Sequence, residues 1–75
     1  GLSRRDEGFF RALRALAYAL SGEPDAAAQE GLAAFGIATT TNSERTTREL
    51  GRVMKVLDPW RTRPGPRQLQ EALRR

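Results

Sequence analysis

The chain has 75 residues, of which 39% are hydrophobic and 29% are charged, and it contains neither Cys nor His. A chain this short forms one small domain, which we place at residues 1–75, as a whole protein or as a fragment of a larger one. The lack of Cys and His rules out disulfides, thiolate metal sites and the commonest acid–base group. No segment approaches the ~20 apolar residues of a membrane span. We therefore expect no membrane contact and a cytoplasmic location.

The positive charge is concentrated in the second half of the chain. Residues 1–37 hold four basic and five acidic residues, a net charge of −1, whereas residues 38–75 hold nine basic and four acidic residues, a net charge of +5. Such an asymmetry suggests a polyanionic partner or a basic tail.

A first helix is predicted from about Arg4 to Leu20. Ser3 suits its N-cap, and two acidic residues follow in the first turn, where the helix dipole favours anions. One helix face, expected to be buried, carries Phe9, Leu13, Leu16 and Leu20 and is widened by Phe10 and Ala17. Phe10 is adjacent to Phe9, and the two cannot both enter one small core. An exposed Phe10 would be an anchor in a protein interface.

A second helix is predicted from Pro24, with Leu32 and Phe35 inward and with its end at Gly36. Gly31 inside this helix either weakens it or marks the close approach of a neighbouring helix. The following stretch "IATTTN" contains three successive Thr, which favour a short strand or a loop. Thr41 with Glu44 fits a capping box for the next helix, and Asn42 or Ser43 could cap it instead.

A third helix is predicted from about Glu44 to Leu57. At 100° per residue, one face carries the apolar residues Leu50, Val53, Met54 and Leu57, and the nearly opposite face carries the cations Arg45, Arg48, Arg52 and Lys55. The apolar face therefore enters the core, and the cations face solvent. Asp58-Pro59 ends the helix, and Trp60 is expected to fold back over the core.

The segment "RTRPGPRQ", residues 61–68, is predicted to form a stiff basic turn because it holds two Pro, one Gly and three Arg. Pro66 can open a last short helix with Leu69, Ala72 and Leu73 inward. The expected fold is all-α: a small three- to four-helix bundle, with a helix-turn-helix-like arrangement and a basic turn after the third helix as one option.

The basic face of the third helix has two interpretations, a solvated surface or a surface that meets phosphate. Only Glu49 lies near it as a partner, and Arg, which outnumbers Lys twelve to one, suits bidentate contact with phosphate or guanine. A genome rich in G and C would also raise the Arg content. We expect the chain to bind nucleic acid, with DNA as the first candidate. The expected contacts are Arg45, Arg48, Arg52, Lys55, Arg61 and Arg63, with the Thr46 hydroxyl at the helix start.

The alternative function is a helical protein-interaction or docking module, in which Phe10 contacts a partner protein or a second copy of the chain. Catalysis has no support, because the acidic residues are scattered and the sequence shows no nucleophile–base pair and no Gly-rich phosphate loop. We therefore expect no enzyme activity, no cofactor and no metal.

The stretch "TNSERTTRELGRVMKVLDPWRTRPGPRQ" resembles the small winged-helix or helix-turn-helix domains that close some phage and plasmid replication proteins of the primase-helicase kind. The resemblance implies a role in replication, with Arg45, Arg48, Arg52 and Lys55 on a DNA-facing helix and Arg61 and Arg63 in a wing. The chain departs from the family at Asp58-Pro59, which replaces a simple Gly before Trp60, and residues 1–37 show no match.

Overall fold

A computed structural model describes residues 3–75, so residues 1 and 2 of the predicted domain lie outside the described part. The chain forms the helices α1 (Arg4–Leu20), α2 (Pro24–Thr41), α3 (Glu44–Val56) and α4 (Pro64–Arg74), with the short 3-10 helix η1 (Asp58–Trp60) before the last. Residues 3–75 contain no strand. The predicted all-α bundle is therefore confirmed.

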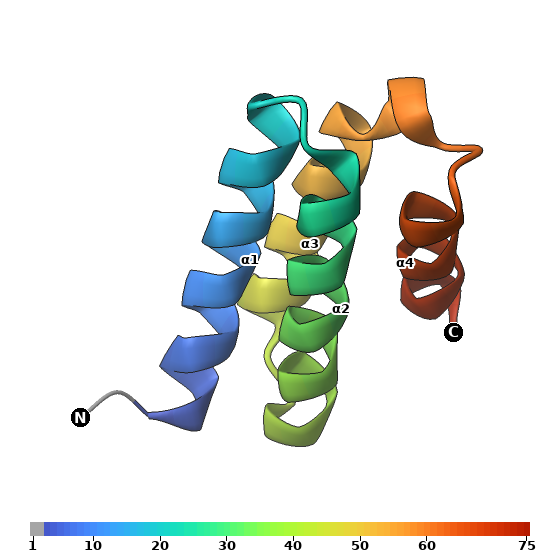
Figure 1. Ribbon diagram of the computed structural model, residues 1–75. Coiled ribbons are helices and arrows are strands. Elements are labelled where there is room, and N and C mark those ends of the chain that lie inside the picture. The colour runs from blue at the N-terminus through green and yellow to red at the C-terminus, as the bar shows by residue number, and fades with distance from the viewer. Residues whose placement is uncertain (1–2) are drawn as a thin grey trace.

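The helices are arranged around α2 (Figure 1). The neighbours α1 and α2 run antiparallel, α3 lies behind them in the same direction as α1, and α4 lies on the side of α2 away from α1. The most extensive packing is between α1 and α2. The outer surface of α1 is therefore far from the C-terminal helix.

The large side chains of the core come mainly from α3 and α4. Leu50, Val53, Leu57 and Leu69 are fully buried, and burying a side chain of this size contributes about 1.5–3 kcal/mol. Trp60 packs against this cluster, as predicted. The other buried hydrophobic residues are alanines of α1 and α2 and Ile37 of α2.

The prediction of the buried face of α1 was only partly right: Leu16 packs against the core, but Leu13 and Leu20 do not. The buried residues are Gly8, Ala12, Ala15 and Ala19, whereas Leu13 is 37% exposed and Leu20 is 69% exposed. The reason is close helix packing: a Cβ atom at Gly8 would lie 2.8 Å from Cγ2 of Ile37 on α2. Only small side chains fit where the two backbones approach this closely, so the larger leucines are turned away.

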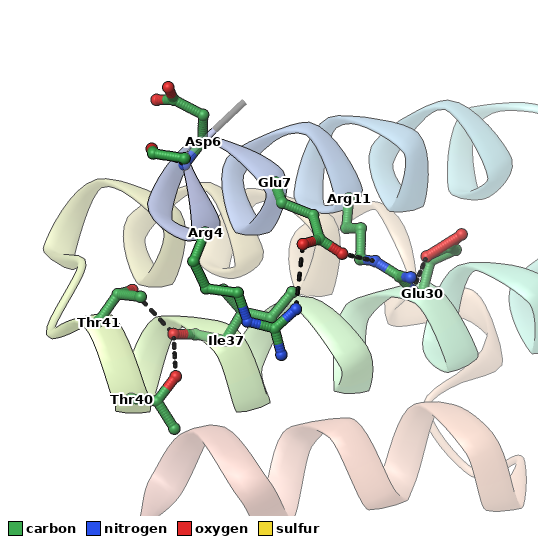
Figure 2. Close-up of polar contacts among 9 residues, drawn as sticks. Arg4, Asp6, Glu7, Arg11, Glu30, Ile37, Thr40 and Thr41 are labelled. Atoms are coloured by element: carbon green, nitrogen blue, oxygen red, sulfur yellow. Dashed lines mark hydrogen bonds and ion pairs between the residues drawn. The ribbon is translucent and has the colours of Figure 1, made fainter. Parts of the chain in front are cut away.

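The prediction that α2 ends at Gly36 was also wrong, and so was the expected strand or loop at "IATTTN". The helix continues to Thr41, and Asn42 follows in the left-handed conformation with φ 54°. Ile37 and Ala38 are buried, which favours continuation of the helix. Each threonine hydroxyl also donates to a carbonyl of the preceding turn, as with Thr41 Oγ1 to the Ile37 oxygen at 2.8 Å (Figure 2). The intrinsic preference of threonine is overridden by tertiary packing.

The end of α2 is also held by α1. The Arg5 guanidinium donates to the carbonyl oxygens of Thr41 and Asn42, each at 3.0 Å. Carbonyls at a helix C-terminus lack partners within the helix. Arg5 therefore supplies the hydrogen bonds that the last turn of α2 lacks.

The last helix begins earlier than predicted, at Pro64 and not at Pro66. A Cβ atom at Gly31 would lie 2.7 Å from Cδ2 of Leu69. Of the two interpretations of Gly31, the structure therefore supports the close approach of a neighbouring helix. The glycine creates the space in which α4 docks on α2.

Candidate functional site

The two faces of α3 lie as the sequence predicts. Leu50, Val53 and Leu57 are fully buried, Met54 is half-buried, and all four predicted cations are exposed: Arg45, Arg48, Arg52 and Lys55. The helix begins at Ser43, whose Oγ accepts a hydrogen bond from the Thr46 amide at 3.3 Å. This N-cap and the buried face together fix which way the cations point.

Four of the six cations predicted to contact nucleic acid have a carboxylate partner within the chain. The pairs are Arg45 with Asp6 at 3.6 Å, Arg52 with Glu49 at 3.5 Å, Arg61 with Asp58 at 3.6 Å, and Arg63 with Asp25 at 3.4 Å. The four arginine side chains are more than half exposed, and such surface pairs are weak. Each carboxylate nevertheless neutralises part of the charge that a phosphate would meet.

Arg45 has a second contact, with α1. Its guanidinium carbon lies 4.1 Å from the centroid of the Phe9 ring, a cation–π geometry. Together with the Asp6 pair, this contact joins the first turn of α3 to the first half of α1.

Arg48 and Lys55 are the two predicted contacts without such a partner. Among residues 3–75, no carboxylate lies within 4.0 Å of either cation. The two are seven residues apart and therefore lie on one face of α3, about 10 Å from each other along the helix. They are the exposed cations of α3 that no carboxylate of residues 3–75 neutralises.

Thr46 does not belong to this surface. It is fully buried, and its Oγ1 accepts a hydrogen bond from Ser43 Oγ at 3.1 Å. Thr46 lies four residues before Leu50, on the core face of α3. Its hydroxyl is therefore not available to a base or a phosphate, and its prediction as a nucleic-acid contact was wrong.

Glu49 is a residue whose burial the sequence did not predict. It is only 9% exposed, its Oε1 pairs with Arg52, and its Oε2 is buried with no hydrogen-bond partner among residues 3–75. The only signal in the sequence was its place on the helical wheel, between the core face and the cation face. The expected pairing with the cations is present for Arg52.

The basic turn is shorter than predicted and is not a wing in this structure. Arg61 and Arg63 lie between η1 and α4, and no strand flanks them within residues 3–75. Arg61 also donates to the Asp58 carbonyl at 3.0 Å. The guanidinium groups of both arginines thus contact other residues of the chain, Asp58 for Arg61 and Asp25 for Arg63.

The exposed side of α1 carries a continuous row of apolar side chains. Phe10 is 52% exposed, Leu13 is 37% exposed and Leu20 is 69% exposed, and Ala17 between them is exposed as well. Their spacings of three, four and three residues place them on one helix face. We call these four residues the α1 apolar row; from Phe10 to Leu20 it is about 15 Å long.

The sequence predicted only part of this row. Phe10 is exposed as expected, but Leu13 and Leu20 were expected in the core. The row was missed because the larger apolar residues were assigned to the buried face, whereas here that face is made of Gly and Ala.

The side of α1 that faces α2 carries a series of ion pairs (Figure 2). Glu7 pairs with Arg4 at 3.0 Å and with Arg11 at 3.5 Å, and Glu30 of α2 pairs with Arg11 at 3.4 Å. Glu30 also pairs with Arg14 at 3.0 Å. With the small-residue packing, these pairs hold α1 against α2. The α1 apolar row is therefore presented by a helix that is fixed in place.

The described part of the chain gives little support for a metal site or for a membrane-spanning helix. Within residues 3–75, no three His, Cys, Asp or Glu side chains are grouped so that they could hold a metal ion. No helix of that part combines the length and the apolar character needed to cross a bilayer. One open hollow of about 400 Å³ lies where α2 ends and α3 begins, beside Asn42, Thr47 and Arg48.

Comparison of the chain with protein-family models, with curated proteins and with solved structures finds no match. The fold and the surfaces described above therefore carry the functional interpretation.

Proposed function

We propose that this chain is a helical docking module that binds another protein through the α1 apolar row. The observation that supports the proposal is the exposure of Phe10, Leu13 and Leu20 on one face of one helix. Exposed apolar patches bordered by polar residues are typical of interaction sites. A few well-buried residues supply most of the binding energy of many interfaces.

The packing of α1 favours this function. Binding costs free energy when a flexible segment must become ordered. The small-residue contact between Gly8 and Ile37 and the ion pairs of Glu30 fix α1 before any partner arrives. A partner that covers the row therefore gains apolar burial with little ordering cost on this side of the interface.

Site-specific cross-linking tests the proposal. A photo-reactive p-benzoylphenylalanine is placed at Ala17, in the row, or at Gln68, an exposed residue of α4, in cells that carry the gene. We expect a discrete protein adduct from position 17 that disappears with Leu13→Glu and is absent from position 68. Equal adducts from both positions, or adducts that persist with Leu13→Glu, contradict the proposal.

Nucleic-acid binding is the second candidate function, favoured by the exposed and unpaired Arg48 and Lys55. Two phosphate contacts predict that affinity falls about tenfold between 50 and 200 mM salt, whereas all six predicted contacts would give about a thousandfold fall. The measurement is a titration with single- and double-stranded oligonucleotides over this range of salt.

A pair of double variants controls for net charge. Replacing Arg48 and Lys55 by Gln should abolish binding, whereas replacing Arg74 and Arg75 of the C-terminus by Gln should leave most of it. If both double variants weaken binding equally, the effect is one of overall charge, and α3 has no special role.

A further inference from the structure

We infer that the partner segment that covers the α1 apolar row is an acidic amphipathic helix. The inference deepens the proposed docking function and rests on it. The partner helix has an apolar face that covers the row and carboxylates that pair with the cations of α3.

The row borders α3 along its length. Phe9 contacts Arg45 of α3, so the side of α1 that carries Phe9 faces α3. Leu13 and Leu20 follow Phe9 by four and eleven residues and lie on the same side of the helix. The row therefore runs beside α3.

The facing side of α3 is basic near its start and middle. Arg45 and Arg52 are seven residues apart and share one side of the helix. The helices α1 and α3 run in the same direction (Figure 1), so Arg52 lies further along the row than Arg45. Val56 follows four residues later and is half-buried. The apolar row is thus bordered by two arginines and then by a valine.

The charge at this border is positive. Asp6, with a side chain 49% exposed, offsets Arg45. The partner of Arg52, Glu49, is 9% exposed and so presents little negative charge to an incoming molecule. Arg48 and Lys55 lie next to Arg45 and Arg52 on the outward face of α3, about 10 Å apart. Two carboxylates seven residues apart on a partner helix have the same spacing and would reach both cations.

The same charges disfavour a second copy of the chain as the occupant. A second copy of the chain carries a net charge of +4 and would bring cations towards cations. A helix fits the shape of the row, which is one helix wide and about 15 Å long, in the manner of helix-in-groove recognition.

A pair of designed peptides tests the inference. Both are helical peptides of about 16 residues, long enough to span the row, with Leu at the spacing of the row; one carries Glu on its flanks and the other Lys. Fluorescence anisotropy measures their binding to the full chain. We expect the acidic peptide to bind at least tenfold more tightly than the basic one, and its affinity to fall as salt is raised.

Matched variants locate the binding. Leu13→Glu should weaken the acidic peptide at least tenfold, whereas Gln68→Glu on α4, which changes the net charge equally, should change its affinity less than twofold. Replacing Arg48 and Lys55 by Gln should reduce the advantage of the acidic peptide over the basic one to less than threefold. Replacing Arg74 and Arg75 by Gln should leave that advantage intact.

The other outcomes separate the inference from the proposed function. Equal binding of both peptides, lost with Leu13→Glu, overturns the acidic partner but supports docking at the row. Self-association in sedimentation equilibrium that Leu13→Glu abolishes also overturns the acidic partner and supports docking at the row, with a second copy of the chain as the occupant. Binding of neither peptide overturns the inference alone, because the cross-linking result stands separately. Binding to vesicles of anionic lipid that Leu13→Glu abolishes, with no peptide binding, overturns both.

Discussion

At the scale of the residue, the fold depends on where the chain has glycine, which lacks a Cβ atom. Gly31 and Gly36 lie in the same helix, five residues apart. A Cβ atom at Gly31 would lie 2.7 Å from Cδ2 of Leu69, whereas a Cβ atom at Gly36 would meet nothing within 4 Å. Glycine is thus required by packing at one position and only tolerated at the other.

Gly31→Ala should destabilise the protein and Gly36→Ala should stabilise it. Alanine gains up to about 1 kcal/mol in an exposed helical position, so Gly36→Ala should raise the free energy of unfolding by about that amount. At Gly31 overpacking against the fully buried Leu69 should outweigh this gain and lower the free energy of unfolding by about 1–2 kcal/mol. Urea denaturation followed by circular dichroism measures both values. A gain at both positions would mean that Leu69 moves freely in its site.

At the scale of the element, α1 has two faces with opposite composition. The inner face holds Ala12, Ala15 and Ala19, and the outer face holds the large apolar side chains of the α1 apolar row. In most amphipathic helices the large side chains are buried. Here the buried face is set by how closely α1 and α2 approach, and hydrophobicity alone does not predict it.

Leucine substitutions on the two faces should therefore have different effects. Ala15→Leu adds three heavy atoms to a fully buried position and should cost about 2–4 kcal/mol, because α2 cannot move away without breaking other contacts. Ala17→Leu, two residues later on the exposed face, should change stability by less than about 0.5 kcal/mol. Thermal denaturation of the two variants at low protein concentration compares them. Equal effects would show that the α1–α2 contact is loosely packed.

How much of each element the sequence predicted depended on whether its signals were local. The start of α1 and the two faces of α3 were predicted, and Ser43 was among the candidate N-caps, because caps and helical periodicity lie within one segment. The capping box expected at Thr41 was wrong, since Thr41 is still part of α2. The end of α2 was not, because Ile37 is held in the helix by α1 and not by its neighbours in sequence. The pairing of Arg45 with Asp6 was missed for the same reason: the two residues meet only in the folded chain.

At the scale of the whole molecule, α4 is attached through few large side chains. Leu69 is its only fully buried leucine, and it lies over Gly31 of α2. A domain of this length has a total stability of about 4–11 kcal/mol. The loss of one core leucine is a large fraction of that value.

Leu69→Ala should reduce the free energy of unfolding by about 3 kcal/mol and loosen α4. The matched substitution Leu20→Ala removes the same atoms from a residue that is 69% exposed and should cost less than about 0.5 kcal/mol. Amide hydrogen exchange distinguishes the effects, because α4 amides should lose protection in the first variant only. Unchanged protection of α4 would show that other contacts suffice to hold it.

The alanine-lined contact between α1 and α2 has a consequence for how this molecule can change over generations. The residues that hold α1 in place and the residues that α1 displays are different sets on opposite sides of one helix. Substitutions at Phe10, Leu13 or Leu20 can therefore alter which molecule is recognised while the architecture persists. Selection can act on specificity and on foldedness through separate positions of the same seventeen-residue segment.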